Sequence, residues 1–306
     1  MDANPYIGTT PRGDHDYVKR LLNRLLPKSM RSQAVTIPVI RLHGTIMAGG
    51  GQFRPSLSLA STASLIEKAF AFPNAPAVAI SINSPGGSPV QSRLIYKRIR
   101  DLATEKNRKV FVFVEDVAAS GGYMIAVAGD EIIADPSSIV GSIGVVSASF
   151  GFTELIRKIG VERRVYTAGK NKATLDPFKP ENAEDIERLK ALQLEIHDTF
   201  IDLVKTRRGA KLKDDPDLFT GLFWTGKKGL ELGLVDALGD MRTVLKDRFG
   251  AKTRLHLITP PRGFFGRRFG VFGSSAQPDP AQIATAAASG IIDAAEERAL
   301  WNRFGL

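Results

Sequence analysis

Two short runs of β-branched, aromatic and small apolar residues, at 77–82 and 110–114, set the pattern for the centre of the chain. Runs of this kind predict buried strands. Each run leads to a glycine pair and then to a helix-compatible segment, and in residues 90–103 the apolar positions recur at helical spacing. Two successive strand–Gly-Gly–helix units predict an α/β fold with a core of parallel strands. Such sheets place their sites beyond the carboxyl ends of the strands.

Ser120 stands at the second of these turns, between small neighbours that leave its hydroxyl exposed. The backbone N–H groups of Ser120 and Gly121 are expected at the start of the following helix, where an oxyanion is favoured. This setting resembles the nucleophile elbow of hydrolases, although Ala118 replaces the first glycine of that motif. A Ser-Gly-Gly turn selected only for backbone freedom explains the same residues. On these residues alone both interpretations remain open.

Gly87 closes the first turn, in the run Asn-Ser-Pro-Gly-Gly-Ser at 83–88. If the two strands are neighbours, the N–H of Gly87 faces Ser120 and supplies a second oxyanion donor beside Gly121. The alternative is an ordinary Pro-Gly turn, which is common in α/β proteins.

A serine nucleophile needs a base, and the histidines of this chain are poor candidates. None falls between Ser120 and His197, and none has a strongly polar, site-like setting; the four are His15, His43, His197 and His256. A lysine can act as the base if its environment lowers its pKa from about 10.4 to near 7. Ser-Lys pairs are a known variant of the catalytic triad.

Four motifs together resemble the signal peptide peptidase A family of Ser-Lys serine proteases. They occur in the family's order and spacing, over roughly residues 35–250, and are Ile82–Ser88, Ala118–Tyr123, Gly141–Val145, and Trp224–Gly226 followed by Leu230–Asp236. The resemblance implies a crotonase-like fold related to that of Clp protease. It also implies a serine endopeptidase that cuts extended, hydrophobic peptides, such as released signal peptides or unfolded protein segments.

The same resemblance implies the roles of individual residues. Ser120 matches the family's nucleophile and Lys172, in the segment 168–177, matches its base. Lys170 lies two residues earlier and is the nearest competitor. The chain departs from the family at Val140, where a threonine is frequent, and at Leu222, where an arginine often precedes the aromatic residue. Neither departure replaces a catalytic group.

One set of motifs and no internal repeat indicate the one-copy type of this family, which implies a ring-like homo-oligomer. The resemblance leaves open whether the serine and the lysine of a site come from one subunit or from neighbouring subunits. We expect the peptidase domain at 35–260, and a linker with a last helix at 261–306. Residues 1–34 are expected to form a basic amphipathic extension, in which Lys19–Leu26 either contacts an anionic membrane surface or packs on protein. With no secretory or membrane-spanning segment evident, the expected location is cytoplasmic, with peripheral contact at the inner membrane face.

Composition limits the metal sites, cofactors and partners that we expect. The chain has no cysteine, which excludes disulfides and thiolate metal sites, and no metal-ligand cluster or phosphate-binding loop is evident, so no cofactor is expected. The net charge of +10 is scattered and accompanied by no recognition motif, so no nucleic-acid partner is expected. Two alternatives keep the fold: a crotonase-like acyl-CoA enzyme and a non-catalytic membrane-associated scaffold.

Overall fold

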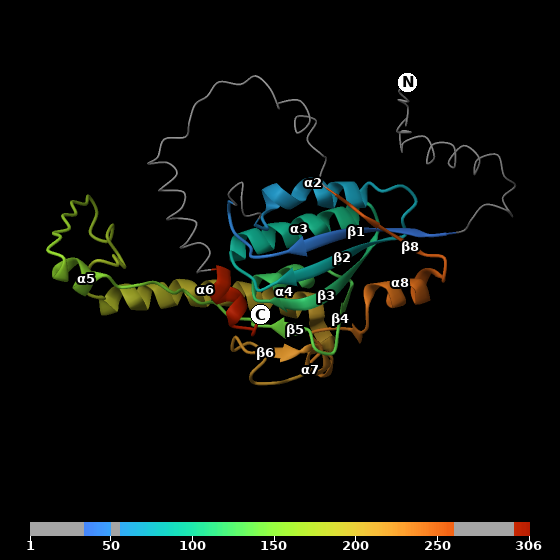
Figure 1. Ribbon diagram of the computed structural model, residues 1–306. Coiled ribbons are helices and arrows are strands. Elements are labelled where there is room, and N and C mark those ends of the chain that lie inside the picture. Colours follow the sequence, from blue (N-terminus) through green and yellow to red (C-terminus); the bar gives the residue numbers. More distant parts are fainter. Residues whose placement is uncertain (1–33, 50–55, 260–296) are drawn as a thin grey trace, which may run out of the picture.

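The computed structural model describes residues 34–49, 56–259 and 297–306 (Figure 1). Its centre is an eight-stranded sheet in the order β6-β5-β3-β2-β1-β8, with β4 paired to β3 and β7 paired to β4. The strands are β1 (Thr36–His43), β2 (Ala77–Ser84), β3 (Lys109–Ala119), β4 (Glu131–Ala134), β5 (Ile139–Gly141), β6 (Phe223–Thr225), β7 (Ala237–Leu238) and β8 (Arg254–Leu257). The helices are α2 (Leu59–Phe70), α3 (Pro89–Glu105), α4 (Gly121–Ala126), α5 (Thr153–Lys158), α6 (Ala183–Arg208), the 3₁₀ turn η1 (Gly209–Lys211), α7 (Gly226–Glu231) and α8 (Met241–Phe249).

The parallel core predicted from the two glycine turns is confirmed. β2 and β3 pair in parallel from Ala77 opposite Lys109 onwards, and every other strand pair is parallel except β5 with β6. Strands that are buried on both faces read as continuous apolar runs, which explains the pattern of 77–82 and 110–114. The two strands end at the same edge, so their glycine turns lie side by side.

Helices and apolar side chains cover both faces of the sheet. On one side α2, α3 and α4 pack their apolar stripes on the sheet, through residues such as Ile66, Ile95 and Ile125, which are 0% exposed (Figure 1). On the other side α8 packs Leu245 against Phe111. Burial of these side chains removes apolar surface from water and is the main stabilising contribution to this part, which we call the body.

A second part, residues 149–192, projects from the body on the first half of α6 (Figure 1), and we call it the arm. None of its residues is buried. The mixture of Leu, Ile and Phe with charged residues over 183–206 predicts a core-facing helix, and the structure shows that this is wrong for most of its length. The buried residues of α6 are Phe200, Val204 and Arg208, all in its last turns. The earlier apolar residues of α6, including Leu192 and Leu194, stay exposed.

A buried ion pair fixes the end of α6 to the body. Arg208 donates from two nitrogens to the Asp236 carboxylate, at 2.7 and 3.1 Å, and the two side chains are 2% and 12% exposed. Asp236 also accepts from the backbone N–H of Ile132 and from Lys211. Burial alone would raise the pKa of Asp236, but these hydrogen bonds outweigh it, so the pKa lies below its ordinary value. The Asp236 motif therefore contributes to the anchor of α6.

Several expectations fall outside the described residues. The extension 1–34, including Lys19–Leu26, lies there except for its last residue, and of the region 261–306 only 297–306 is described. The boundaries of the peptidase domain therefore stay predictions. Within the described part of the chain, no helix has the length and apolar character needed to cross a membrane.

Candidate active site

Ser120 lies at the end of β3 in an unusual backbone conformation. Its φ is 51° and its ψ −122°, and a positive φ is uncommon for a residue with a side chain. Its N–H donates to the Gly141 carbonyl of the neighbouring β5 at 2.8 Å, which holds the turn in place. This corrects one expectation, because the N–H of Ser120 is already used and is not free for an oxyanion. The side chain itself is half-buried at the carboxyl edge of the sheet.

The two glycine turns meet as the sequence predicted. A β-carbon placed on Gly121 would lie 3.4 Å from the backbone nitrogen of Gly87, so the two N–H groups are close neighbours. Gly87 has a φ of 137°, and a β-carbon there would lie 2.1 Å from the Ile46 carbonyl oxygen, so only glycine fits this approach. Among the described residues, neither N–H has a hydrogen-bond acceptor. Two free donors beside a serine hydroxyl are the arrangement that an oxyanion requires.

A buried tyrosine holds the helix that follows Ser120. The Tyr123 hydroxyl, on α4, donates to the carbonyl oxygen of Leu234 at 2.7 Å, and its ring is fully buried. Burial raises the pKa of Tyr123 well above its ordinary value, so the hydroxyl stays protonated and remains a donor. This bond ties the nucleophile turn to the segment that carries the Asp236 anchor.

Two cavities, of about 270 and about 200 Å³, open at Ser120. Five residues line both of them: Ser120, Gly144, Val145, Val146 and Arg303. The larger cavity is otherwise polar, with Ser142, His197 and Thr220 in its wall. The smaller one contains Gly87 and Gly121 together with an apolar set: Pro85, Pro89, Met124, Ile196, Phe200 and Leu300. The smaller cavity therefore combines two N–H donors with an apolar wall.

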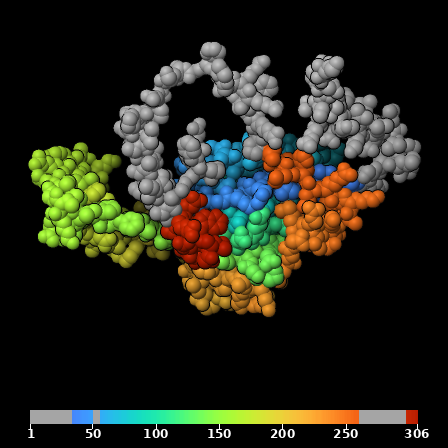
Figure 2. Space-filling model, in the orientation of Figure 1, coloured from blue at the N-terminus to red at the C-terminus, as the bar shows by residue number. Residues whose placement is uncertain are grey.

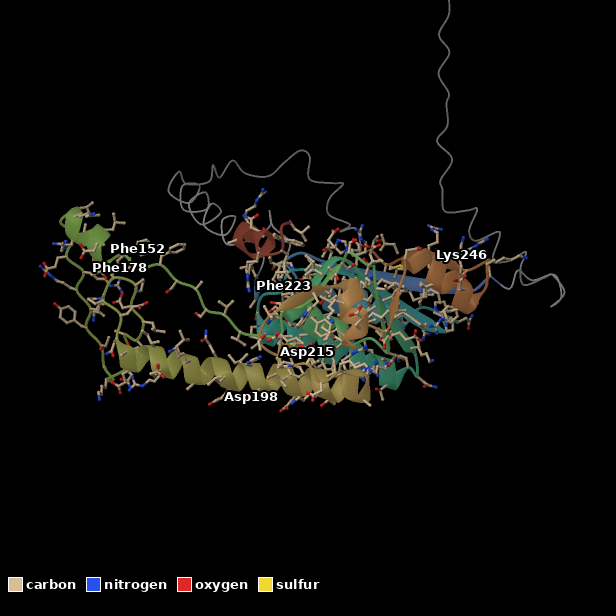
Figure 3. The ribbon with its side chains drawn as sticks, turned by 90° about the horizontal axis from the view of Figure 1, so that it is seen from below. Phe152, Phe178, Asp198, Asp215, Phe223 and Lys246 are labelled. Carbon is tan, nitrogen blue, oxygen red and sulfur yellow. The ribbon has the colours of Figure 1, made fainter. Side chains whose placement is uncertain are left out.

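Lys172 is not part of this site within one chain. It is exposed on the arm, and neither Lys172 nor Lys170 lines a cavity that contains Ser120. Lys170 lines a separate cavity of about 460 Å³ on the arm. In Figure 3, Phe152 and Phe178 mark the far end of the arm, while Phe223 lies on the body. The structure thus brings together Ser120, Gly87 and Gly121, and holds the expected base apart from them.

Two residues line the site that the sequence did not place there: His197, which was considered only as a poor candidate for the base, and Arg303. His197, on α6, lines the larger cavity, and its Nε2 lies 3.0 Å from the carbonyl oxygen of Ile143. Arg303 lines both cavities. No local pattern announces either residue, because both reach Ser120 through packing between distant segments.

The histidine of β1 belongs to a different cluster. His43 Nε2 lies 3.2 Å from Ser81 Oγ and 3.2 Å from a Glu115 oxygen. Burial lowers the pKa of His43, partly offset by the Glu115 carboxylate. His43 lines neither Ser120 cavity. Within the described ranges, no group of three or more His, Cys, Asp or Glu side chains could hold a metal ion.

Comparison with known proteins places this site in a family. Residues 103–251, which include Ser120 and Lys172, match the family described as peptidase family S49. The chain is 35% identical over 212 residues to the chloroplastic serine protease SPPA of Arabidopsis thaliana, covering 67% of this chain and 31% of that protein. It is 69% identical over 287 residues to a Brucella abortus protein named Na(+)/H(+) antiporter NhaA, covering 94% of this chain and 39% of that protein.

A solved structure of the membrane-bound stomatin-specific protease 1510-N aligns with 74% of this chain and 99% of its own, with a TM-score of 0.45 and 16% identity. The chain spans 31% of the length of the Arabidopsis protein and 39% of the length of the Brucella protein. The family match covers three of the four motifs, those from Ala118 onwards, together with the segment that contains Lys172. Through residues 103–251 the chain matches peptidase family S49, in agreement with the signal peptide peptidase A family that its motifs predict.

Proposed function

We propose that the protein is a serine endopeptidase that cuts extended peptides, with Ser120 as the nucleophile and Lys172 of a neighbouring subunit as the base. The observation that carries the proposal is the turn at Ser120. A serine in a strained backbone conformation lies beside two N–H groups that have no acceptor among the described residues, at a cavity with an apolar wall. Strain of this kind, held by surrounding structure, is typical of functional sites.

The proposed chemistry follows from these groups. The Ser120 hydroxyl attacks the peptide carbonyl carbon while the lysine amine accepts its proton, which gives a tetrahedral intermediate. Its oxyanion accepts hydrogen bonds from the N–H groups of Gly87 and Gly121. The lysine then gives the proton to the leaving amine, and an acyl-enzyme forms. Water, deprotonated by the same lysine, attacks this ester, releases the acid and regenerates the serine.

The arm supports a base supplied by a second subunit. Large apolar side chains are exposed on it, including Ile159 at 63% and Tyr166 at 91%. Large apolar side chains that stay exposed on one part of a chain favour an interface there. The family match and the exposed lysine on the same arm make a second copy of this chain the proposed partner. In the resulting ring-like homo-oligomer the arm of one subunit would bring Lys172 to Ser120 of the next.

His197 is the base that a single chain would offer. Its Nε2 lies at hydrogen-bonding distance from a carbonyl oxygen, which only accepts hydrogen bonds. That nitrogen therefore carries the proton and is unable to take one from Ser120. We assign His197 to the cavity wall, and expect His197→Gln to keep most of the activity.

The substrates we propose are extended hydrophobic segments, such as released signal peptides and unfolded protein segments, because the cavity next to the two glycines is apolar. The antiporter name belongs to a Brucella protein of which this chain matches 39%. Ion exchange is not part of the proposed function, because residues 103–251 of this chain match a peptidase family. Peripheral contact with an anionic membrane through Lys19–Leu26, and a cytoplasmic location at the inner membrane face, stay proposals.

Replacing the nucleophile tests this function. Ser120→Ala should lower kcat/KM on casein or a fluorogenic peptide by roughly 10⁴-fold or more, because the covalent route is lost. Ser142→Ala, in the same cavity, is the matched control and should keep most activity. A fluorophosphonate probe should label the wild-type protein on Ser120. Full activity of a clean Ser120→Ala preparation would contradict Ser120 as the nucleophile. A wild-type protein that neither cleaves peptides nor reacts with the probe would support an acyl-CoA enzyme or a scaffold instead.

A further inference from the structure

The carboxyl-terminal segment, residues 297–306, packs on the body beside the nucleophile turn (Figure 2, red). Phe304 is its anchor: the side chain is 8% exposed, packs with Val117 and Ala119 of β3, and lies edge-on to the Phe223 ring with centroids 5.0 Å apart. Trp301 packs against the same cluster. An anchored aromatic residue fixes the position of its neighbours in the chain.

The residue before this anchor is Arg303, which lines both cavities that contain Ser120. Among the residues that the structure describes, no aspartate or glutamate lines either cavity. Within the described part of the chain, Arg303 makes no ion pair, and its guanidinium carbon lies 5.9 Å from the centre of the Phe304 ring. Leu300, from the same segment, contributes to the apolar wall. The cavities therefore present an unpaired cation next to the nucleophile.

We propose that Arg303 determines specificity, by binding a carboxylate of the peptide close to the bond that Ser120 cuts. This rests on the proposed function, because it assumes that a peptide lies across Ser120. The planar guanidinium forms two parallel hydrogen bonds with a carboxylate, and these are stronger where apolar groups exclude water. The carboxylate belongs either to an acidic side chain or to the free carboxyl end of a short peptide.

The two cavities define the substrate class more closely. The smaller cavity takes an apolar side chain, and Arg303 stands at the border between it and the polar cavity. The favoured peptides combine an apolar residue with a carboxylate within about two residues of it, since consecutive residues of an extended chain advance about 3.3 Å each. Basic peptides should be disfavoured, because a second cation would approach Arg303 without a counter-ion.

Binding to an inert protein tests this without relying on turnover. In full-length Ser120→Ala, fluorescence anisotropy would measure the Kd of labelled peptides that differ only by Glu, Gln or Lys beside one leucine, each with a free or an amidated carboxyl end. We expect a carboxylate to tighten binding roughly five- to tenfold over its neutral counterpart. The Glu series and the free-end series separate the two sources of the carboxylate.

Adding Arg303→Gln should remove this preference, Arg303→Lys should keep part of it, and Arg303→Glu should reverse it in favour of the Lys peptide. Arg298→Gln, an exposed arginine of the same segment that lines neither cavity, is the matched control and should change nothing. Equal affinities for all peptides, or a preference that survives Arg303→Gln, would overturn the inference. Either result would leave the serine peptidase proposal intact, since that proposal depends on the Ser120→Ala activity test.

Discussion

The body of this molecule buries its apolar residues, whereas the arm leaves them exposed. In the body, Ile80 and Val112 are 0% exposed, in the centre of a sheet covered by helices. In the arm, α5 buries no residue, and Leu155 and Ile159 are more than half exposed. The arm keeps its shape through a few contacts of its own, such as the Phe152 and Phe178 rings at 5.6 Å.

The two residues of the proposed catalytic pair follow this division. Ser120 lies in the body, where its turn is fixed by a hydrogen bond to β5 and by the packing of Gly87 and Gly121. Lys172 lies in the arm, on the surface. The difference indicates that the nucleophile and the oxyanion donors are formed as soon as one chain folds. In the proposed mechanism the base is added only when another subunit covers the arm.

Removing the base is expected to have the largest effect after loss of Ser120. Lys172→Ala should lower kcat/KM by roughly 10³-fold or more, and Lys172→Arg by a similar factor, because arginine stays protonated in proteins. Lys170→Ala is the matched control from the same loop and should keep much of the activity. A dead Lys170→Ala with an active Lys172→Ala would reverse the assignment of the base.

Placing a charge on the arm tests whether its exposed apolar surface is an interface between subunits. Ile159→Asp should lower activity roughly 10- to 100-fold and reduce the assembled mass on light scattering, because a buried unpaired carboxylate weakens an interface. The melting temperature of the body should stay nearly unchanged. Val90→Asp on α3 is the control, since Val90 is also 63% exposed but lies on the body. An active, fully assembled Ile159→Asp would show that this surface is not an interface.

Removing the Arg208–Asp236 ion pair, which anchors α6 to the body, should mainly affect stability. Asp236→Asn leaves Arg208 buried without its counter-charge, and we expect a loss of about 3 kcal/mol in the free energy of unfolding. Chemical denaturation would measure it. Arg248→Gln, which breaks the more exposed pair with Glu131, should cost less than about 1 kcal/mol. Equal effects of the two substitutions would contradict the assigned role of Asp236.

The same carboxylate gives the sign of a small pH effect. Because the pKa of Asp236 is lowered on folding, its contribution is complete above the unfolded value of 3.8 and is lost as the pH falls below it. The wild-type protein should therefore lose stability more steeply than Asp236→Asn as the pH falls through 4 and below. Parallel curves for the two proteins over that range would contradict the lowered pKa.

The body was largely predictable because its signals are local. The apolar runs of β2 and β3 and the two glycine turns predicted neighbouring parallel strands, and Gly87 does lie beside Gly121. The positions of His197 and Arg303 were not predictable, because each depends on the packing of a distant helix or segment. The burial of the apolar residues in the first half of α6 was mispredicted, because the same residue pattern occurs in a helix that faces a core and in one whose apolar side is exposed.

We propose that each site combines Ser120 of one subunit with Lys172 of another. Mixing two inactive variants tests this arrangement. Ser120→Ala and Lys172→Ala would be unfolded, refolded together in equal amounts, and assayed for peptide cleavage beside each variant refolded alone. Sites shared between subunits predict recovery of about one quarter of the wild-type activity, because a random ring gives that fraction of sites both intact groups. If the mixture reassembles to the wild-type mass but stays as inactive as its two components, the shared site is contradicted.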